Sequence, residues 1–237
     1  MEDYGRLIMF SALGYLIGSV SFARTIFALK RPGEEPVRIT SVSTDGKAVI
    51  TTHAVGATSV MMAMGRKWGV LTMVLDLLKA FIPMVILRVL YPEESYHLIA
   101  GVFILIGHLW PVFYRFNGGG GNSTVMGMML AASPLGFLVT QFGGMALGMI
   151  SPALTFIAVV ALSIPWFMVT EGVLSSETLF AFFMTLFYLL AQFPETRAFL
   201  RYKKEVYVFD TKHVVNMMKH ASKMKTDSHE AGKKGSL

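Results

Sequence analysis

The residues best suited to chemistry lie in one stretch, where an apolar run gives way to a histidine, a proline, a cation and four glycines. Each glycine costs a helix roughly 1 kcal/mol relative to alanine, but consecutive glycines allow backbone N–H groups to converge on a ligand. A helix that begins near Ser123 or Thr124 directs its positive N-terminal end to the same place. We therefore expect an anion-binding site; a flexible hinge between two membrane helices is the alternative. The stretch contains Gly107, His108, Pro111, Arg115, Gly118, Gly119, Gly120, Gly121, Asn122, Ser123 and Thr124.

The composition indicates that the elements around this stretch lie in a membrane. Of the 237 residues, 54% are hydrophobic and 15% are charged, and the mean hydropathy is +0.56. These values are too apolar for an ordinary soluble domain. The first apolar run, residues 7–29, is longer than a signal-peptide core and lacks a basic leading region, so we expect it to remain as a span. The absence of cysteine excludes disulfides and thiolate metal sites, and we expect neither a metal nor a cofactor.

The second expected span, residues 68–91, carries Asp76 and Lys79 within an apolar sequence. Their spacing places both side chains on one face of a helix. Ionised groups at membrane depth are costly and usually face a bundle interior or a wet cavity. The pair is therefore a functional candidate, and the alternative is a mutual ion pair that holds helices together.

Local signals predict the remaining elements. Asp45 followed by Gly46 favours a hairpin turn within the polar segment 32–54, and residues 55–62 favour a short interfacial helix. Two further spans are expected at 96–114 and 178–193. Between residues 124 and 169 we expect three short spans of about 15 residues each. Their predicted breaks are at Ser133 and Pro134, at Gly143 and Gly144, and at Ser151 and Pro152.

The charge distribution predicts the orientation and the division of the chain. Acidic residues precede the first span and basic residues follow it, so the N-terminus is expected outside and the C-terminus in the cytoplasm. The fold class is an all-α polytopic bundle of about seven transmembrane helices; five crossings with a re-entrant pair is the alternative. Residues 1–200 would form the transmembrane domain with its cytoplasmic glycine-rich loops. Residues 201–237, with nine Lys or Arg and four Asp or Glu, would form a basic tail attracted to anionic lipids, and we expect no nucleic-acid partner.

Five motifs, in order over about residues 10–190, resemble the PlsY family of bacterial membrane acyltransferases. They are Gly18-Ser19; Gly56-Ala57-Thr58; Gly65-Arg66-Lys67; Leu75-Asp76-Leu77-Leu78-Lys79; and Gly107-His108-x-x-Pro111-Val112-Phe113-x-x-Phe116-x-Gly118-Gly119. The resemblance implies an inner-membrane enzyme of phospholipid biosynthesis with seven helices and a site at the inner face. Its implied substrates are acyl phosphate and glycerol 3-phosphate, its product is lysophosphatidic acid, and its partners are membrane lipids.

The resemblance also implies roles for individual residues. Acyl phosphate is already activated, so the enzyme chiefly holds two phosphate-bearing substrates in line and stabilises charge on the reacting carbonyl. Ser19 and His108 are the expected catalytic residues, acting through hydrogen bonds, and Asp76 with Lys79 would hold the bundle. The expected substrate-binding residues are Gly56, Ala57, Thr58 and Ser59 in one segment, and Gly118, Gly119, Gly121 and Thr124 in the other. The available cations are Arg66, Lys67, Lys79 and Arg115.

Several positions depart from the family pattern. Ser59 stands where the family has asparagine, Met62 where it has arginine, and Gly120 where it has lysine. Each lost phosphate-directed cation removes a contact of about 1.5–3 kcal/mol. Residues 51–54 replace the family's Gly-Ser-Gly-Asn, and its closing His-x-x-Asn is absent at residues 194–197. Arg38, His213 and Asn216 are candidates for displaced parts of the pattern.

These departures keep two other functions open. A non-catalytic relative would retain the fold and bind lipid or a protein partner, and the missing cations favour it. A transporter or channel is opposed by the short chain and by the concentration of polar residues on one face rather than along a path.

Overall fold

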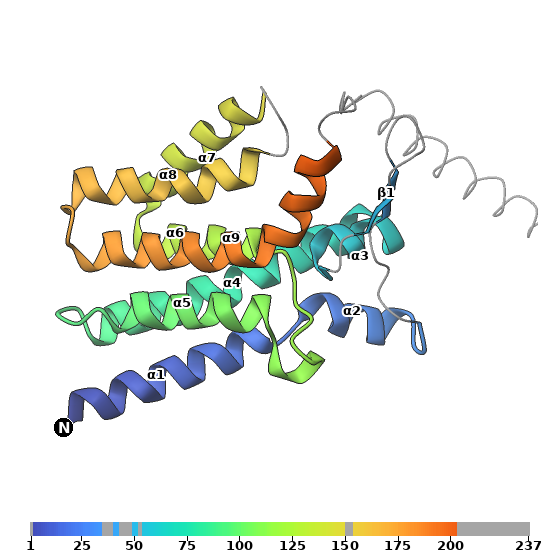
Figure 1. Cartoon of the computed structure of the whole chain (residues 1–237). Helices are drawn as coiled ribbons and strands as arrows, with labels where there is room; N and C mark the ends of the chain where they lie inside the picture. The colour runs from blue at the N-terminus through green and yellow to red at the C-terminus, as the bar shows by residue number, and fades with distance from the viewer. Residues whose placement is uncertain (1, 35–39, 43–48, 52–53, 150–153, 203–237) are drawn as a thin grey trace, which may run out of the picture.

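The computed structural model describes residues 2–34, 40–42, 49–51, 54–149 and 154–202. Within these residues the chain forms nine α-helices, one short 3-10 helix and one pair of strands (Figure 1). The helices are α1 (Glu2–Ser19), α2 (Phe22–Lys30), α3 (Ala57–Met64), α4 (Arg66–Leu90), α5 (Tyr96–Leu109), η1 (Val112–Tyr114), α6 (Asn122–Ala132), α7 (Pro134–Gly148), α8 (Leu154–Thr170) and α9 (Ser176–Tyr202); the strands are β1 (Thr40–Val42) and β2 (Val49–Thr51).

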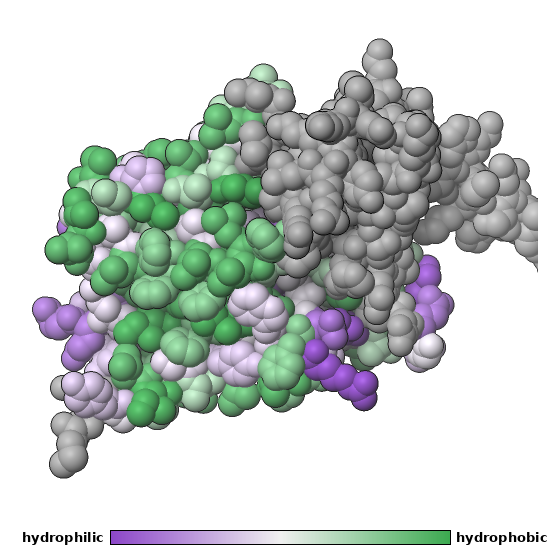
Figure 2. Space-filling model, in the orientation of Figure 1, coloured by the Kyte–Doolittle hydropathy of each residue, from purple (hydrophilic) through white to green (hydrophobic). Residues whose placement is uncertain are grey.

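Long apolar helices dominate the fold. In the described part of the chain, four helical stretches are long and apolar enough to cross a membrane: Tyr4–Lys30, Arg66–Leu90, Tyr96–Tyr114 and Ser176–Phe193. Figure 2 shows hydrophobic residues across the region of the long helices and hydrophilic residues toward its two ends. The predicted membrane helix bundle is confirmed, and the second and third predicted spans match α4 and α5 closely.

The first predicted span is not one continuous helix. α1 ends at Ser19, and α2 begins after Ser21, whose backbone is extended and whose Oγ accepts a hydrogen bond from the N–H of Arg24 at 3.4 Å. A serine in this conformation is a favourable N-cap. The predicted span over residues 7–29 matches the stretch Tyr4–Lys30, and the local cap at Ser21 divides it into two helices.

The predicted hairpin is partly described. β1 and β2 pair antiparallel, with Thr40 opposite Thr51 and Val42 opposite Val49. The expected turn at Asp45 and Gly46 lies outside the described residues, as does Arg38. The all-α class therefore holds for the bundle, with one short strand pair in the loop between α2 and α3.

Three helices fill residues 122–170, but one predicted break is wrong. Ser133 ends α6 and caps α7: its Oγ accepts from the N–H of Gly136 at 3.0 Å, and Pro134 occupies the first turn. Gly144, in contrast, lies inside α7, where a Cβ would overlap Val159 of α8. The glycines allow close helix contact there instead of ending a helix. The predicted break at Ser151 and Pro152 lies outside the described residues.

Close packing of α1 against α5 brings the ends of both helices together. At Gly18 a Cβ would overlap the carbonyl of Ile104, and at Gly107 it would overlap the carbonyl of Tyr15. Small residues at such positions let two helix backbones approach closely in a membrane. α5 also packs on α4 and α9, and α4 packs on α6. The shared core includes Met84, Ile104, Met128 and Met184, which have no exposed surface.

The two glycine segments and the strand pair lie at one end of the bundle. This end contains the C-terminal ends of α1 and α5, the N-terminal end of α6, and the short helices α2 and α3 (Figure 1). The tail from residue 203, including His213 and Asn216, lies outside the described residues.

Candidate functional site

The second glycine segment, residues 118–121, lies across the end of α5. The N–H of Gly119 donates to the carbonyl of His108 at 3.1 Å. A Cβ at Gly118 would overlap the carbonyl oxygens of His108 and Leu109. Gly121, the N-cap of α6, has a φ of +85°, a conformation that favours glycine. The glycines therefore allow the chain to pass close to α5 and then start α6.

The first glycine segment joins the second directly. The N–H of Val55 donates to the carbonyl of Gly118 at 3.0 Å. Gly56 then caps α3, and Ser59, which is fully buried, accepts from the Gly56 N–H at 3.5 Å and donates to the carbonyl of Ala54 at 3.2 Å. The first turns of α3 and α6 present backbone N–H groups that have no partner within their own helices. The two predicted binding segments are thus brought together.

Ala57 and Thr58 form the first turn of α3, where Ala57 is half-buried and Thr58 is exposed. A Cβ at Gly56 would meet no atom of the described residues within 4 Å. The surface beside Gly56 is therefore open, unlike the surface at Gly118 and Gly119. This difference means that a ligand has access from the side of α3.

His108 lies behind the second glycine segment. It is 7% exposed, and its Nδ1 lies 2.8 Å from the Nζ of Lys79. The Nε2 edge of the ring faces Gly119, since a Cβ at Gly119 would overlap Nε2 and Cε1. His108 is therefore held on one side by a cation and faces the glycine segment on the other.

Lys79 and Asp76 form a buried ion pair, with Nζ and Oδ1 2.9 Å apart. Nζ also donates to the carbonyls of Val20 at 2.9 Å and Gly18 at 3.2 Å. The predicted alternative of an ion pair that joins helices is confirmed, because α4 is tied to the end of α1 and to α5. Its approach to His108 was not predicted.

Ser19 is fully buried at the end of α1. Its Oγ accepts a hydrogen bond from the N–H of Val112 at 3.4 Å, and nearby the Tyr15 hydroxyl donates to the carbonyl of Trp110 at 2.9 Å. These bonds hold the turn after α5 against α1. Ser19 thus lies close to the predicted site, and the hydrogen bond that the structure gives its side chain is to a backbone N–H.

Thr124, the third residue of α6, is fully buried. Within the described residues its Oγ1 has no hydrogen-bond partner. A buried hydroxyl without a partner costs about 1–3 kcal/mol. Its position one turn from Gly121 places this unused hydrogen-bonding capacity beside the glycine segment.

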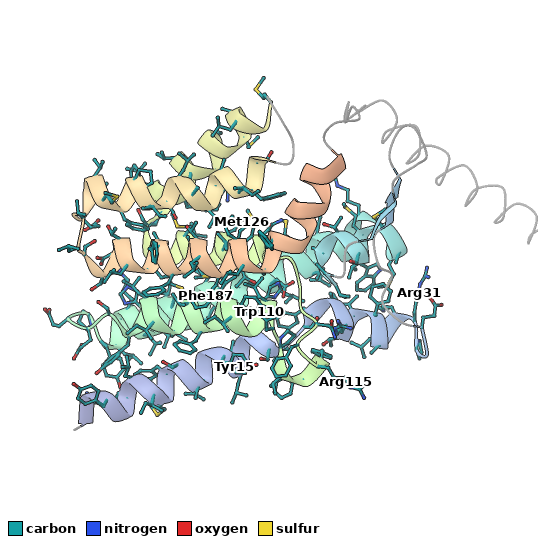
Figure 3. All side chains as sticks on the ribbon, in the orientation of Figure 1. Tyr15, Arg31, Trp110, Arg115, Met126 and Phe187 are labelled. Carbon is teal, nitrogen blue, oxygen red and sulfur yellow. The ribbon has the colours of Figure 1, made fainter. Side chains whose placement is uncertain are left out.

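The predicted cations are not all at the site. Lys79 is buried within it, whereas Arg66, Lys67 and Arg115 are exposed. Lys67 lies 5.8 Å from the ring of Trp68. Figure 3 shows Arg115 on the turn after α5 and Arg31 at the far end of α2, while Trp110 and Phe187 lie side by side in the bundle with ring centroids 6.4 Å apart.

Sequence reasoning missed two residues that support the glycine segment. Arg24 of α2 donates to the carbonyl of Asn117 at 2.9 Å and lies 4.9 Å from the ring of Tyr114. Gln192 of α9 donates through Nε2 to the carbonyl of Gly120 at 2.9 Å. The available signal was weak: each is a polar residue in an apolar helix. Among the described residues, no three His, Cys, Asp or Glu side chains gather in a way that could hold a metal ion.

An apolar groove runs between α1 and α5 on the face of the long helices. It has a volume of about 690 Å³. Tyr15 and Ile106 line the end of the groove nearest to Ser19 and His108. The lining residues are Leu7, Ile8, Ser11, Ala12, Tyr15, Ile99, Phe103 and Ile106.

Comparisons with known proteins point to one family. A family model described as "Glycerol-3-phosphate acyltransferase" matches residues 8–202. A protein of that name from Aquifex aeolicus is 38% identical over 121 residues, covering 51% of this chain and 56% of the relative. Another from Mycoplasma mycoides is 30% identical over 181 residues, covering 72% of this chain and 65% of the relative. The matches thus span between half and two thirds of these relatives' own lengths.

Two solved structures share the fold. Both are of PlsY, described as an integral membrane glycerol 3-phosphate acyltransferase. The glycerol 3-phosphate form is 25% identical, with a TM-score of 0.71, and the match covers 88% of this chain and 98% of that one. The lysophosphatidic acid form is 25% identical, with a TM-score of 0.67 and coverage of 82% and 92%.

Proposed function

The chain belongs to the PlsY family of glycerol-3-phosphate acyltransferases, and from this premise we propose that it transfers an acyl group from acyl phosphate to the 1-hydroxyl of glycerol 3-phosphate. The observation that carries the proposal is the bond from Val55 to Gly118, which joins two glycine segments at the N-terminal ends of α3 and α6. Two helix N-termini beside each other suit two phosphate-bearing substrates.

The substrates are assigned to the two segments. Gly56, Ala57, Thr58 and Ser59 bind one phosphate from the open side of α3, and Gly118, Gly119, Gly121 and Thr124 bind the other beside α6. The resemblance of the whole fold to a structure described as a glycerol 3-phosphate form supports this assignment. The hydroxyl of Thr124 supplies a hydrogen bond that the described protein residues leave unused.

The reaction needs positioning more than covalent catalysis. The 1-hydroxyl oxygen attacks the acyl carbonyl carbon, a new ester bond forms, and the bond from that carbon to the phosphate oxygen breaks. The phosphate leaves with the bonding electron pair, and the hydroxyl proton passes to it or to water. Because the acyl group is already activated, alignment and stabilisation of the carbonyl charge are the main demands. His108 is the proposed donor for that charge, and Ser19 supports the adjoining turn; no cofactor is required.

The acyl chain of the donor is assigned to the groove between α1 and α5. A lining of aliphatic and aromatic side chains suits a hydrocarbon, and the groove opens on the membrane-facing surface. Its inner end at Tyr15 and Ile106 is within a turn of Ser19 and His108. The acyl phosphate therefore enters the site laterally from the bilayer, and glycerol 3-phosphate enters from the aqueous side.

Seven crossings of the inner cell membrane are proposed, with the N-terminus outside and the C-terminus in the cytoplasm. The end of α4 lies beside the end of α6, since Arg88 donates to the carbonyl of Ala131 at 3.0 Å. Successive helices α4 to α9 then alternate in direction. Residues 201–237 extend from the cytoplasmic end as a basic segment that binds anionic lipid headgroups.

A non-catalytic relative is the second candidate. It is favoured by Gly120 and Met62 at cationic positions of the family pattern, and by the exposure of Arg66, Lys67 and Arg115. Such a protein would keep the bundle and bind a lipid or a protein subunit.

Acyl transfer from palmitoyl phosphate to radiolabelled glycerol 3-phosphate separates the candidates. We expect turnover by the purified full-length protein, and a loss of at least about 100-fold in Gly119→Ala, whose new methyl group displaces the His108 ring. His108→Ala should also lose activity. Gly5→Ala is the matched control, because a Cβ there meets no atom within 4 Å. A folded, monodisperse wild-type protein without turnover would support the non-catalytic candidate.

A further inference from the structure

We propose that Lys79 is a positioning residue that fixes the tautomer of His108, so that the Nε2–H of His108 faces the glycine segment. The step from this N–H to catalysis rests on the proposed function; the tautomer itself does not. Lys79 then has a task beyond holding the bundle together.

The contacts of Lys79 converge from three helices. Nζ lies 2.9 Å from Asp76 Oδ1 on its own helix, 2.9 Å from the carbonyl of Val20 after α1, and 2.8 Å from His108 Nδ1 on α5. The side chains of Lys79 and Asp76 are 3% and 4% exposed. The hydrogen-bond partners of Nζ are the carbonyls of Val20 and of Gly18, at 3.2 Å, together with His108 Nδ1, and these three are as many as an ammonium group has N–H donors; Asp76 Oδ1 adds the opposite charge of the ion pair.

The chemistry of the ammonium group decides the state of the ring. A lysine ammonium donates hydrogen bonds and cannot accept them, so Nδ1 must offer a lone pair at 2.8 Å. For a Lys79 held charged by its pairing with Asp76 at 2.9 Å, this disfavours both the Nδ1–H tautomer and the doubly protonated ring, and Asp76 Oδ1, 3.8 Å from Nδ1, is too far to accept a hydrogen bond from the ring instead. The neutral ring then carries its proton on Nε2, because the bond made by one ring nitrogen sets the state of the other.

In this tautomer the Nε2–H of His108 points toward Gly119. Gly119 is tied to the carbonyl of His108 and lies against the Nε2 edge of the ring. Within the described residues the structure gives Nε2 no hydrogen bond. The N–H is therefore available to an oxygen atom of a substrate held by residues 118–121.

If Lys79 served only to stabilise the fold, its substitution would affect catalysis independently of His108. A buried ion pair can often be replaced by apolar residues without loss of stability, and a lysine that only caps α1 needs no histidine beside it. If Lys79 acts through His108, the two residues should behave as a coupled pair in catalysis. If it acts only on stability, their effects should be independent.

The first test reads the tautomer without any substrate. The full-length protein, labelled with ¹⁵N-histidine in detergent, is examined by long-range proton–nitrogen correlation spectra, and His108→Asn identifies which signal of the six histidines belongs to His108. We expect the Nε2–H pattern in the wild type, in the exposed-lysine control Lys67→Met and in Lys79→Arg. We expect its loss in Lys79→Met. An Nδ1–H or doubly protonated pattern in the wild type would overturn the proposal even if Lys79→Met does not fold.

The second test uses the acyl-transfer assay. Lys79→Met should lower kcat about 10- to 100-fold, the loss expected when one hydrogen bond to a charged group is removed, with KM for glycerol 3-phosphate changed less. When Lys79→Met is added to His108→Asn, kcat should fall little further than in His108→Asn alone. If the two substitutions lower kcat independently, so that their losses multiply, the proposed coupling is overturned. If the wild type has no turnover, the proposed function fails, and the spectra still decide the tautomer.

Discussion

At the scale of single residues, the site combines side chains that are fully used with one that is not. The hydroxyl of Ser19 accepts a hydrogen bond from the Val112 N–H, and the hydroxyl of Ser59 donates one to the carbonyl of Ala54. Thr124 is equally buried, yet its Oγ1 has no partner within the described residues. A protein that carries this cost in its empty state is expected to recover it when a ligand with a hydrogen-bonding oxygen binds.

Thr124→Val tests this expectation. Removing a hydroxyl that has no protein partner should stabilise the substrate-free protein, by up to about 1–3 kcal/mol. The same change should raise KM for a phosphate-bearing substrate roughly tenfold, because a lost bond of about 1.4 kcal/mol corresponds to that factor. Thermal unfolding and steady-state kinetics measure the two effects.

Thr185→Val is the matched control. Thr185 is also buried in the bundle, but its hydroxyl donates to the carbonyl of Val160 at 3.0 Å. The control should lose stability and leave KM unchanged. A Thr124→Val protein that is less stable, or that binds substrate as before, would show that Thr124 has no ligand to bind.

At the scale of elements, the pairing of α1 with α5 performs two tasks. Close contact at Gly18 and Gly107 joins the helices near the site. Along their apolar face the same two helices line a groove of about 690 Å³. One helix pair thus aligns Ser19 with His108 and leaves room for a hydrocarbon chain.

Filling the groove should therefore change chain-length preference. Ala12→Trp places a large ring among the lining residues. Excluding two methylene groups of the acyl chain costs about 1.6 kcal/mol, at about 0.8 kcal/mol each, or roughly a tenfold rise in KM for palmitoyl phosphate. A donor with a short acyl chain should be affected less.

Leu13→Trp provides the comparison, since Leu13 is exposed and does not line the groove. Kinetics with long and short donors should distinguish the two variants. Equal effects of Ala12→Trp on both donors would mean that the chain binds elsewhere.

At the scale of the whole molecule, the natural absence of cysteine makes topology directly measurable. Each introduced cysteine is the sole target for a membrane-impermeant maleimide. With seven crossings, Glu93→Cys, Leu135→Cys and Leu174→Cys should be labelled in intact cells, and Glu34→Cys and Met149→Cys should react after the membrane is opened. Leu135→Cys discriminates most sharply: protection of this position from outside would favour five crossings with a re-entrant pair.

The sequence predicted the elements that depend on local or strongly periodic signals. α3 to α5 lie near their expected bounds, and the proline at 134 ended α6 as expected. The error at Gly144 arose because glycine favours both helix ends and close packing, and a partner helix decides between them. The break before α2 depended on a single serine cap.

For the site, the sequence identified the residue types but not their partners. The glycine segment 118–121 and the pair of Asp76 and Lys79 were found from composition and spacing, and the segment 56–59 from the family resemblance. The contact of Lys79 with Val20 spans 59 residues and that with His108 spans 29. No local pattern contains such contacts, and Arg24 and Gln192 were missed for the same reason.

The buried ammonium group of Lys79 also imposes an order on biogenesis. α4 carries the ion pair of Asp76 and Lys79 into the bilayer, and the carbonyls that receive Lys79 belong to the end of α1 and to Val20 after it, which are synthesised earlier. Because ionised groups at membrane depth are costly even as a pair, the presence of α1 when α4 inserts lowers the cost of burying Lys79. His108 joins only when α5 follows. The end of the bundle that holds the candidate site is thus assembled as α1, α4 and α5 follow one another, and a chain lacking α1 is expected to insert α4 less efficiently.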